Sequence, residues 1–308
     1  MWRCMTMWTY HFKIDAVEAG KTIKELWEAW YLPQRIRGAL RIHRTYQVNG
    51  QYVPTNYLLK QADDLKIDFL ADFFRTSDSQ YQPNTARTIP IIFENDDLVI
   101  VDKPAGMKMH PHSPTEQDTL LHYLAGYFKV QQTTSAGTVA RPYMIHRLDR
   151  ETSGLVIVAK NPVVVPIMNR LLADKKIQRT YLAWVTGSVP ARSGVMNEPI
   201  GIDEIDERKR AVNGMAAQPA ITNWYRVHAV YQNTLLRLKL DTGRMHQIRI
   251  HLAFHGHPIV GDSLYGDENV YPRMLLHAMS IGMIMPFSQQ THFVTGTLPK
   301  DFPNQLKL

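Results

Sequence analysis

An aspartate flanked by two arginines is the part of the sequence whose residue types most clearly suggest a role in chemistry. Asp149 stands between Arg147 and Arg150, shortly before the apolar run Leu155–Ala159. Arginines are rarely buried unless they are paired. Two cations beside one carboxylate therefore indicate an anion kept ionised for chemistry, with both arginines also available to phosphates. The simpler alternative is that Asp149 and Thr152 only form the turn before a strand, and spacing alone leaves both interpretations open.

A second polar cluster lies in residues 241–266, DTGRMHQIRIHLAFHGHPIVGDSLYG. After a turn at Gly243, the apolar residues Ile248 and Leu252 are spaced i, i+4, which predicts a helix. The basic side chains on or near the first turns of this helix are Arg244, His246, Arg249 and His251. They could face a bound partner, or they could form the solvated face of an ordinary amphipathic helix.

The elements that position these clusters must come from a chain of 308 residues, for which one large and one small domain are expected. No run of eighteen apolar residues occurs, so no membrane-spanning helix is predicted. The N-terminus lacks the pattern of a signal peptide. Cys4 is the only cysteine, which excludes an internal disulfide and fits the cytoplasm. The formal net charge of +7 fits a nucleic-acid partner without requiring one.

Residues 1–75 are predicted to form a small α+β module. Its expected elements are a strand over 8–14, helices over 22–30 and 33–43, a hairpin over 45–53 and a strand over 65–70. In the hairpin, Asn49-Gly50 supplies the two positive φ angles that a type I′ turn needs.

Residues 76–90 are polar, contain two prolines and are predicted to be a linker. The large domain then covers 91–308, where short β-forming runs such as LVIVDKP, GLVIVAK and TYLAWVTG predominate. Helical patterns occur only in a few places, among them 118–128 and 163–177. Many strands with few crossover helices predict an α+β fold built on a mixed, largely antiparallel sheet.

Four sequence pieces, taken together and in order, resemble a known family. They are IFENDDLVIVDKPAGMKMHP at 92–111, HRLDRETSG at 146–154, TGRMHQIRIHLAFHGHPIVGD at 242–262 and LLHA at 275–278. This ordered set resembles the signature of the RluA-type RNA pseudouridine synthases and spans most of the chain. The N-terminal module likewise resembles a degenerate S4-type RNA-binding domain, with Ala19-Gly20-Lys21-Thr22 in place of the usual Arg-Leu-Asp run.

The resemblance implies an enzyme that breaks the N-glycosidic bond of a uridine in RNA and rejoins the same uracil through carbon. A glycosidase needs two carboxylates because its sugar leaving group must be protonated. Uracil leaves as a stabilised anion, so one carboxylate can suffice, and an isomerisation needs no metal, nucleotide or redox cofactor. By resemblance Asp149 is the catalytic aspartate, acting either as nucleophile or as base at the ribose.

The resemblance also assigns partners to Asp149. Arg244 is expected to pair with it, since a guanidinium stays charged and can bond both carboxylate oxygens. Tyr181 is expected to stack on the target base. The alternatives are a surface arginine after a turn for Arg244 and a core tyrosine on a strand for Tyr181.

Four further residues complete the expected RNA-binding set. Arg147 corresponds to an arginine that fills the gap left by the flipped base, which offsets part of the unstacking cost. Leu276 is expected to lie beneath the target base, with ordinary core packing as the alternative. His146 and His246, which adjoin these motifs, are also expected to contact the substrate.

Other polar motifs are interpreted as structural. Lys103 ends a strand, although a phosphate contact is possible for it. The histidine groups at 110 and 112 and at 251, 255 and 257 lack the glutamate of a HExxH motif and supporting cysteines, so no zinc site is expected. No glycine-rich nucleotide loop is present in the sequence.

Two other functions compete with an RNA pseudouridine synthase. One is a catalytically silent RNA-binding protein that keeps the same fold. The other is a nucleoside hydrolase, which would want a paired carboxylate or a metal near Asp149. For the synthase, ribosomal RNA is the first expected substrate and transfer RNA the second, and the chain is expected to act as a monomer without a membrane partner.

Overall fold

The computed structural model describes residues 6–131, 139–266 and 271–303. The N-terminal module contains the predicted elements, which are β1 (Met7–Lys13), α1 (Ile23–Ala29), α2 (Gln34–His43), β2 (Tyr46–Val48) and β3 (Asp64–Leu70), with sheet order β1-β3-β2. Helix α1 begins where it does because Thr22 and Glu25 form a capping box. Asn49 and Gly50 have φ angles of 51° and 79° and connect β2 to Gln51 through the predicted tight turn.

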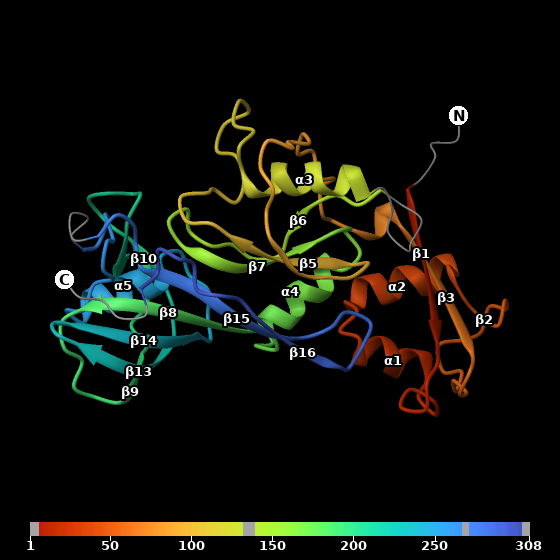
Figure 1. Cartoon of the computed structure of the whole chain (residues 1–308). Helices are drawn as coiled ribbons and strands as arrows, with labels where there is room; N and C mark the ends of the chain where they lie inside the picture. The colour runs from red at the N-terminus through yellow and green to blue at the C-terminus, as the bar shows by residue number, and fades with distance from the viewer. Residues whose placement is uncertain (1–5, 132–138, 267–270, 304–308) are drawn as a thin grey trace.

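A ten-stranded sheet forms the centre of the large domain (Figure 1). Its main path runs β4-β5-β7-β15-β8-β14-β13-β9, while β16 pairs with β15 and β6 with β7. The strands are β4 (Ile91–Glu94), β5 (Leu98–Lys103), β6 (Tyr143–Met144), β7 (Ser153–Ala159), β8 (Gln178–Thr186), β9 (Ser193–Met196), β13 (Thr222–Val230), β14 (Asn233–Leu240), β15 (Leu276–Ile284) and β16 (Thr291–Thr295). Within the described residues every strand pairing is antiparallel except β7 with β15, so the predicted mixed, largely antiparallel α+β fold is confirmed.

Strand β7 shows why an unbroken apolar run is needed at the centre of this sheet. All seven of its residues are buried. Leu155 and Ile157 point into a core shared with α4 (Val165–Ala173), while Val156 and Val158 pack with α3 (Leu120–Gln131). The two helices cover opposite faces of the sheet (Figure 1). A strand with helices on both faces must be apolar on both, unlike the half-exposed strands at the sheet edge.

The N-terminal module is packed firmly against the large domain and shares a core with it. Phe287 lies against Tyr10, Phe12 and Trp30 with ring centroids 5.0–5.6 Å apart. At the same boundary the Tyr10 hydroxyl donates to Asp97 at 2.6 Å. Residues 76–90, the predicted linker, contain no helix or strand. The module is therefore distinct in topology but continuous in packing.

Several elements of the structure were not predicted from the sequence. These are the short strands β6 and β9, strands β15 and β16, the 3₁₀ turn Ala71–Phe73, and a small sheet of β10 (Ile200–Ile202), β11 (Arg210–Val212) and β12 (Met215–Gln218). Of these, β15 matters most because it lies between β7 and β8 at the centre of the large sheet. Its insertion there brings the start of β7, the start of β15 and the middle of β8 into neighbouring positions.

Candidate active site

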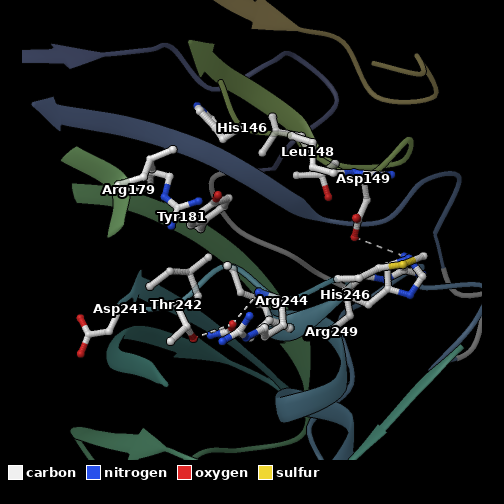
Figure 2. A pocket seen from close by; sticks show the side chains of 18 of the residues that line it. His146, Leu148, Asp149, Arg179, Tyr181, Asp241, Thr242, Arg244, His246 and Arg249 are labelled. Atoms are coloured by element: carbon white, nitrogen blue, oxygen red, sulfur yellow. Dashed lines mark hydrogen bonds and ion pairs between the residues drawn. The ribbon is translucent and has the colours of Figure 1, made fainter. Parts of the chain in front are cut away.

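The polar clusters at 146–149 and 241–249 line one cleft with a volume of about 540 Å³. The turn before β7 forms one wall, and the loop after β14 with the first turn of α5 (Gln247–Phe254) forms the other. Tyr181 of β8 and Leu276 of β15 also line the cleft. Figure 2 shows side chains from both walls facing this cleft, among them Asp149, Tyr181 and Arg249. The sheet order thus assembles residues that lie more than 100 positions apart in the sequence.

Asp149 lies in a turn that is fixed from behind by Lys103. The Asp149 carbonyl accepts from the Thr152 amide at 3.2 Å, and its carboxylate is 18% exposed to the cleft. Lys103 is fully buried and donates from Nζ to the carbonyls of Pro104, Met107 and Arg150 at 2.9–3.0 Å. Its burial excludes a phosphate contact, which confirms the structural interpretation of Lys103. Burial also lowers the pKa of Lys103 to about 7.

The guanidinium beside Asp149 belongs to Arg249, in the first turn of α5. Its Nη1 lies 3.5 Å from Oδ2 of Asp149. The other side of the same guanidinium makes a bidentate pair with Asp262, from Nε at 2.8 Å and from Nη2 at 2.7 Å. Arg249 and Asp262 are almost fully buried. Burial opposes the charged form, but the hydrogen bonds and charge of Asp262, followed by the charge of Asp149, raise the pKa of Arg249.

The predicted ion pair between Arg244 and Asp149 is wrong for this structure. Arg244 is exposed, and its Nε donates to the carbonyl of Pro219 at 3.0 Å. Its amide donates to Gln247 Oε1, which fixes the turn that leads into α5. Arg244 precedes the helix and is held outward by Pro219, whereas Arg249 sits on the buried side of the first turn and faces Asp149. Arg244 still lines the cleft.

His246 belongs to a hydrogen-bond chain behind Arg249. The residue has a left-handed φ of 57° before α5, and its Nδ1 lies 2.9 Å from the Tyr265 hydroxyl. That hydroxyl already accepts from the Arg210 amide at 2.8 Å, so its proton is available to His246. Burial lowers the pKa of His246, and burial raises the pKa of Tyr265 to about 12. The Tyr265 ring also covers the Arg249 guanidinium, 5.1 Å from the ring centroid.

Tyr181 and Leu276 form a buried apolar floor. Tyr181 is 4% exposed and Leu276 is 3% exposed, although both line the cleft. Tyr181 pairs with Ala278 and Leu276 with Ala183 in the β15–β8 ladder, so both side chains are fixed by sheet register. Burial raises the pKa of Tyr181, which keeps its hydroxyl un-ionised near neutral pH. A flat ring and an aliphatic side chain suit a planar base.

His146 and Arg147, adjacent in sequence, have different surroundings. The His146 ring is turned toward β7, where Nε2 accepts from the Ile157 amide at 3.0 Å. Burial, followed by the charge of Arg179, lowers the pKa of His146 to about 3. Arg147 is exposed at the mouth of the cleft. His146 thus braces the Asp149 turn, whereas Arg147 is accessible to a ligand.

The remaining histidines singled out in the sequence contact each other or bond other residues, as His110 and His112 do with ring centroids 5.5 Å apart. His251 is fully buried between Thr222 Oγ1 and the Glu198 carbonyl, and His257 bonds the Thr186 carbonyl. Within residues 6–131, 139–266 and 271–303, no three His, Cys, Asp or Glu side chains are grouped so that they could hold a metal ion. None of the helices in this part of the chain is long and apolar enough to span a membrane.

The charges around the cleft favour a polyanion. The lining cations are Arg147, Lys175, Arg179, Arg244 and Arg249, whereas the lining carboxylates are Asp149 and Asp241. Asp241 is exposed at the edge, so Asp149 is the carboxylate of the inner cleft. The cations at the margin suit a phosphate backbone. The partly sheltered carboxylate and the apolar floor suit a nucleotide that is flipped out of that backbone.

Comparisons with known proteins agree with this arrangement. Residues 97–254 match the model of the RNA pseudouridylate synthase family, and residues 10–65 match the N-terminal domain of RluD ribosomal pseudouridine synthase. The uncharacterized RNA pseudouridine synthase YhcT of Bacillus subtilis is 29% identical over 96% of this chain and 91% of its own length. Ribosomal large subunit pseudouridine synthase D of Zymomonas mobilis is 32% identical over 73% of this chain and 74% of its own.

A solved structure supports the fold. Human RNA Pseudouridylate Synthase Domain Containing 1 aligns with a TM-score of 0.57 and 24% identity, over 71% of this chain and 86% of that one. The chain belongs to the RNA pseudouridylate synthase family, of the RluA type that the ordered motifs indicated. It is accordingly an enzyme that isomerises uridine in RNA.

Sequence reasoning placed Arg249 in the second polar cluster but did not assign it as the partner of Asp149, and it missed Asp262. A signal for Arg249 was present, because an arginine inside the apolar stretch IRIHL must be buried and therefore paired. No sequence pattern indicated that Asp262 is buried and paired, since a Gly-Asp pair after a helix is typical of an ordinary turn.

Proposed function

We propose that this enzyme converts a uridine of ribosomal RNA to pseudouridine and that Asp149 carries the reaction. The observation that carries the proposal is the sheltered carboxylate of Asp149, held 3.5 Å from the Arg249 guanidinium above a floor of Tyr181 and Leu276. Arg249 directs the carboxylate toward the cleft because Asp262 fixes the guanidinium from the other side.

The reaction begins with a uridine turned out of the RNA into the cleft, with its base against Tyr181 and Leu276. Asp149 acts at the ribose, either by attack on C1′ or by removal of a proton from C2′. The C1′–N1 bond breaks, and its electron pair stays on the uracil. The uracil rotates and C5 forms a bond to C1′. This step breaks the Asp149–C1′ ester of the first route, or returns the proton from Asp149 to C2′ in the second. The C5 proton is then lost, and N1 gains a proton. Atoms and charge balance without an external reagent.

Several residues take supporting roles in this proposal. Arg147, exposed at the mouth, occupies the space that the base leaves in the RNA. Arg244 contacts the RNA from the loop before α5, and neutral His246 offers its free ring nitrogen to the nucleotide. His146 acts by bracing the Asp149 turn. The Arg-rich margin supplies the salt-dependent backbone contacts.

Ribosomal RNA is favoured over transfer RNA by the comparisons. The N-terminal match is to a domain described from a ribosomal pseudouridine synthase, and a relative is named for the large ribosomal subunit. We extend that substrate to this chain, acting as a monomer in the cytoplasm. The S4-like character of the N-terminal module belongs to the same proposal, with α2 as its exposed basic face.

The direct test compares the wild type with Asp149→Asn on ribosomal RNA from cells that lack the protein, with pseudouridine mapped by carbodiimide labelling and reverse transcription. We expect Asp149→Asn to lower the single-turnover rate by about 10³-fold or more, the scale of losing an essential base or nucleophile. RNA affinity should persist, because no positive charge is removed. Asp241→Asn, at the exposed edge of the same cleft, is the matched control and should keep its activity.

Each other result has a definite meaning. Activity in Asp149→Asn would exclude the proposed chemistry. Modification of transfer RNA, but not of ribosomal RNA, would replace the substrate and keep the mechanism. Tight RNA binding with no pseudouridine from the wild type on either RNA would favour the silent RNA-binding protein.

A further inference from the structure

Arg179, on β8, is a partly buried cation of the cleft whose guanidinium has no hydrogen-bond or ion-pair partner among the described residues. Its Nε is buried, and in the part of the chain that the structure describes it finds no hydrogen-bond acceptor. No carboxylate there lies within ion-pair distance of Arg179 either. Leaving a buried donor unpaired is costly. Arg249 and Arg244, in the same cleft, contact Asp262 and the Pro219 carbonyl respectively.

The loop after β14 is shaped around this guanidinium. Gly243 has an ordinary φ, so the backbone there does not require glycine. A Cβ at this position would instead lie 3.3 Å from Nη1 and 3.5 Å from Nη2 of Arg179. The absence of a side chain at 243 therefore provides the space in which the guanidinium rests. Both walls of the cleft thus contribute to the placement of one unpaired cation.

The groups around Arg179 do not compensate its charge. Tyr181 lies two positions along the same strand and hence on the same side of the sheet. Burial keeps the Tyr181 hydroxyl un-ionised and His146 neutral, and the Arg179 charge acts in the same sense on His146. Figure 2 shows Arg179 next to Tyr181, with Asp149 on the other side of the tyrosine. A base lying on the Tyr181 ring, with its ribose at Asp149, would direct its far edge toward Arg179.

We propose that Arg179 binds the carbonyl edge of the target uracil and stabilises the uracil anion while the glycosidic bond is broken. The inference rests on the proposed function. When C1′–N1 breaks, the electron pair stays on uracil and spreads onto its carbonyl oxygens. A guanidinium that donates to one of these oxygens binds the anion more strongly than the neutral nucleotide, which is what accelerates a reaction. No proton moves to or from Arg179. The charge on uracil is quenched when C5 bonds to C1′, and the later loss of the C5 proton is matched by protonation of N1.

The test measures single-turnover rates at saturating RNA and the Kd for RNA, separately. We expect Arg179→Gln to lower the rate by about 10²-fold, the usual scale for removing one donor to a developing anion, with a small change in Kd. Arg179→Lys should recover part of the rate because it restores the charge. The matched control is Arg192→Gln, an exposed arginine outside the cleft, which should behave like the wild type. Thermal unfolding establishes that each variant is folded.

Two further measurements test the specific chemistry. RNA with 5-fluorouridine at the target position carries a base that leaves as a more stable anion, so the loss caused by Arg179→Gln should be smaller with it. This reaction is followed by the disappearance of 5-fluorouridine from nuclease digests. Gly243→Ala keeps the charge but places a Cβ 3.3 Å from Nη1, so the guanidinium must shift by a few tenths of an ångström. The rate should therefore fall less than in Arg179→Gln, since the cost grows with the misplacement of a catalytic group.

Three results would overturn the role of Arg179. The first is an unchanged rate for Arg179→Gln. The second is a weaker Kd with a shallower salt dependence and a normal rate at saturation, which would assign Arg179 to a backbone phosphate. The third is an equal loss with uridine and 5-fluorouridine. If the wild type makes no pseudouridine, the proposed function and this role fail together; if only Arg179→Gln stays fully active while Asp149→Asn is inactive, the role of Arg179 alone is wrong.

Discussion

The buried cations next to Asp149 and the cations at the rim of the cleft are held in opposite ways. Behind the Asp149 turn, the Lys103 ammonium donates to three carbonyls, and beside Asp149 the Arg249 guanidinium is shared between Asp262 and Asp149. On the rim, Arg147, Lys175 and Arg179 make no ion pair with any described residue, and the first two are exposed. Cations with protein partners fix the position of Asp149, whereas those without partners are available to RNA. Positive charge in this site therefore has two roles, which burial and partners distinguish.

The largest effect is expected when Asp262, the carboxylate that holds Arg249, is removed. Asp262→Ala leaves a buried guanidinium largely uncompensated and should lower the free energy of unfolding by about 3–5 kcal/mol, measured by urea denaturation. Pseudouridine formation should fall as well, because Arg249 can then turn away from Asp149. Asp206→Ala, which removes an exposed ion pair with Arg208, is the control and should change stability little. An equally small change for Asp262→Ala would mean that Arg249 does not depend on its buried partner.

The second prediction concerns the pH dependence of the Lys103 contacts. The pKa of Lys103 is lowered to about 7 in the fold from its ordinary 10.5. Between these values the unfolded chain binds one proton more than the folded protein, so this contribution to stability rises with pH. It is largest above the unfolded pKa, falls as the pH drops to the folded pKa and is constant below it.

Lys103→Met removes that dependence. Above neutral pH, the unfolding free energy of the wild type should therefore rise relative to that of the variant, by at most about 1.4 kcal/mol for each pH unit. Denaturation curves between about pH 6 and pH 9 measure it. A difference independent of pH over this range would show that Lys103 stays protonated on folding.

The smallest effect is expected on the rim. Lys175→Gln removes one exposed charge and should reduce the slope of log K against log salt by about 0.7–0.9, the value for one phosphate contact. Filter binding or fluorescence anisotropy at several salt concentrations measures this slope. An unchanged slope would mean that Lys175 makes no phosphate contact.

The sequence predicted much of the fold because local patterns decide much of it. The apolar run at 155–159, the turn at Asn49-Gly50 and the helices at 22–30 and 33–43 all appear as expected. The central strand β15 was missed because its sequence, LHAMSIGMI, contains a glycine and methionines and only two β-branched residues. That strand is specified by its neighbours β7 and β8, and such pairing has no local signature.

The candidate site was predicted less completely than the fold. The sequence located Asp149, Tyr181 and Leu276, and the structure brings all three to one cleft. The resemblance assigned Arg244 as the partner of Asp149, whereas the structure places Arg249 there. The pairing depends on where α5 begins and which side of its first turn is buried. The first residue of a helix can be assigned one or two positions earlier or later for the same sequence, and such a shift changes which side chains belong to the first turn.

The aromatic contact between Phe287 and the N-terminal module has a consequence for how RNA can be chosen. Because Tyr10, Phe12 and Trp30 share one core with the large domain, the module cannot swing on residues 76–90 as a tethered domain would. The exposed basic face of α2 and the cleft at Asp149 are therefore held at one fixed separation. An RNA bound by both would have to span that separation before its uridine could reach Asp149.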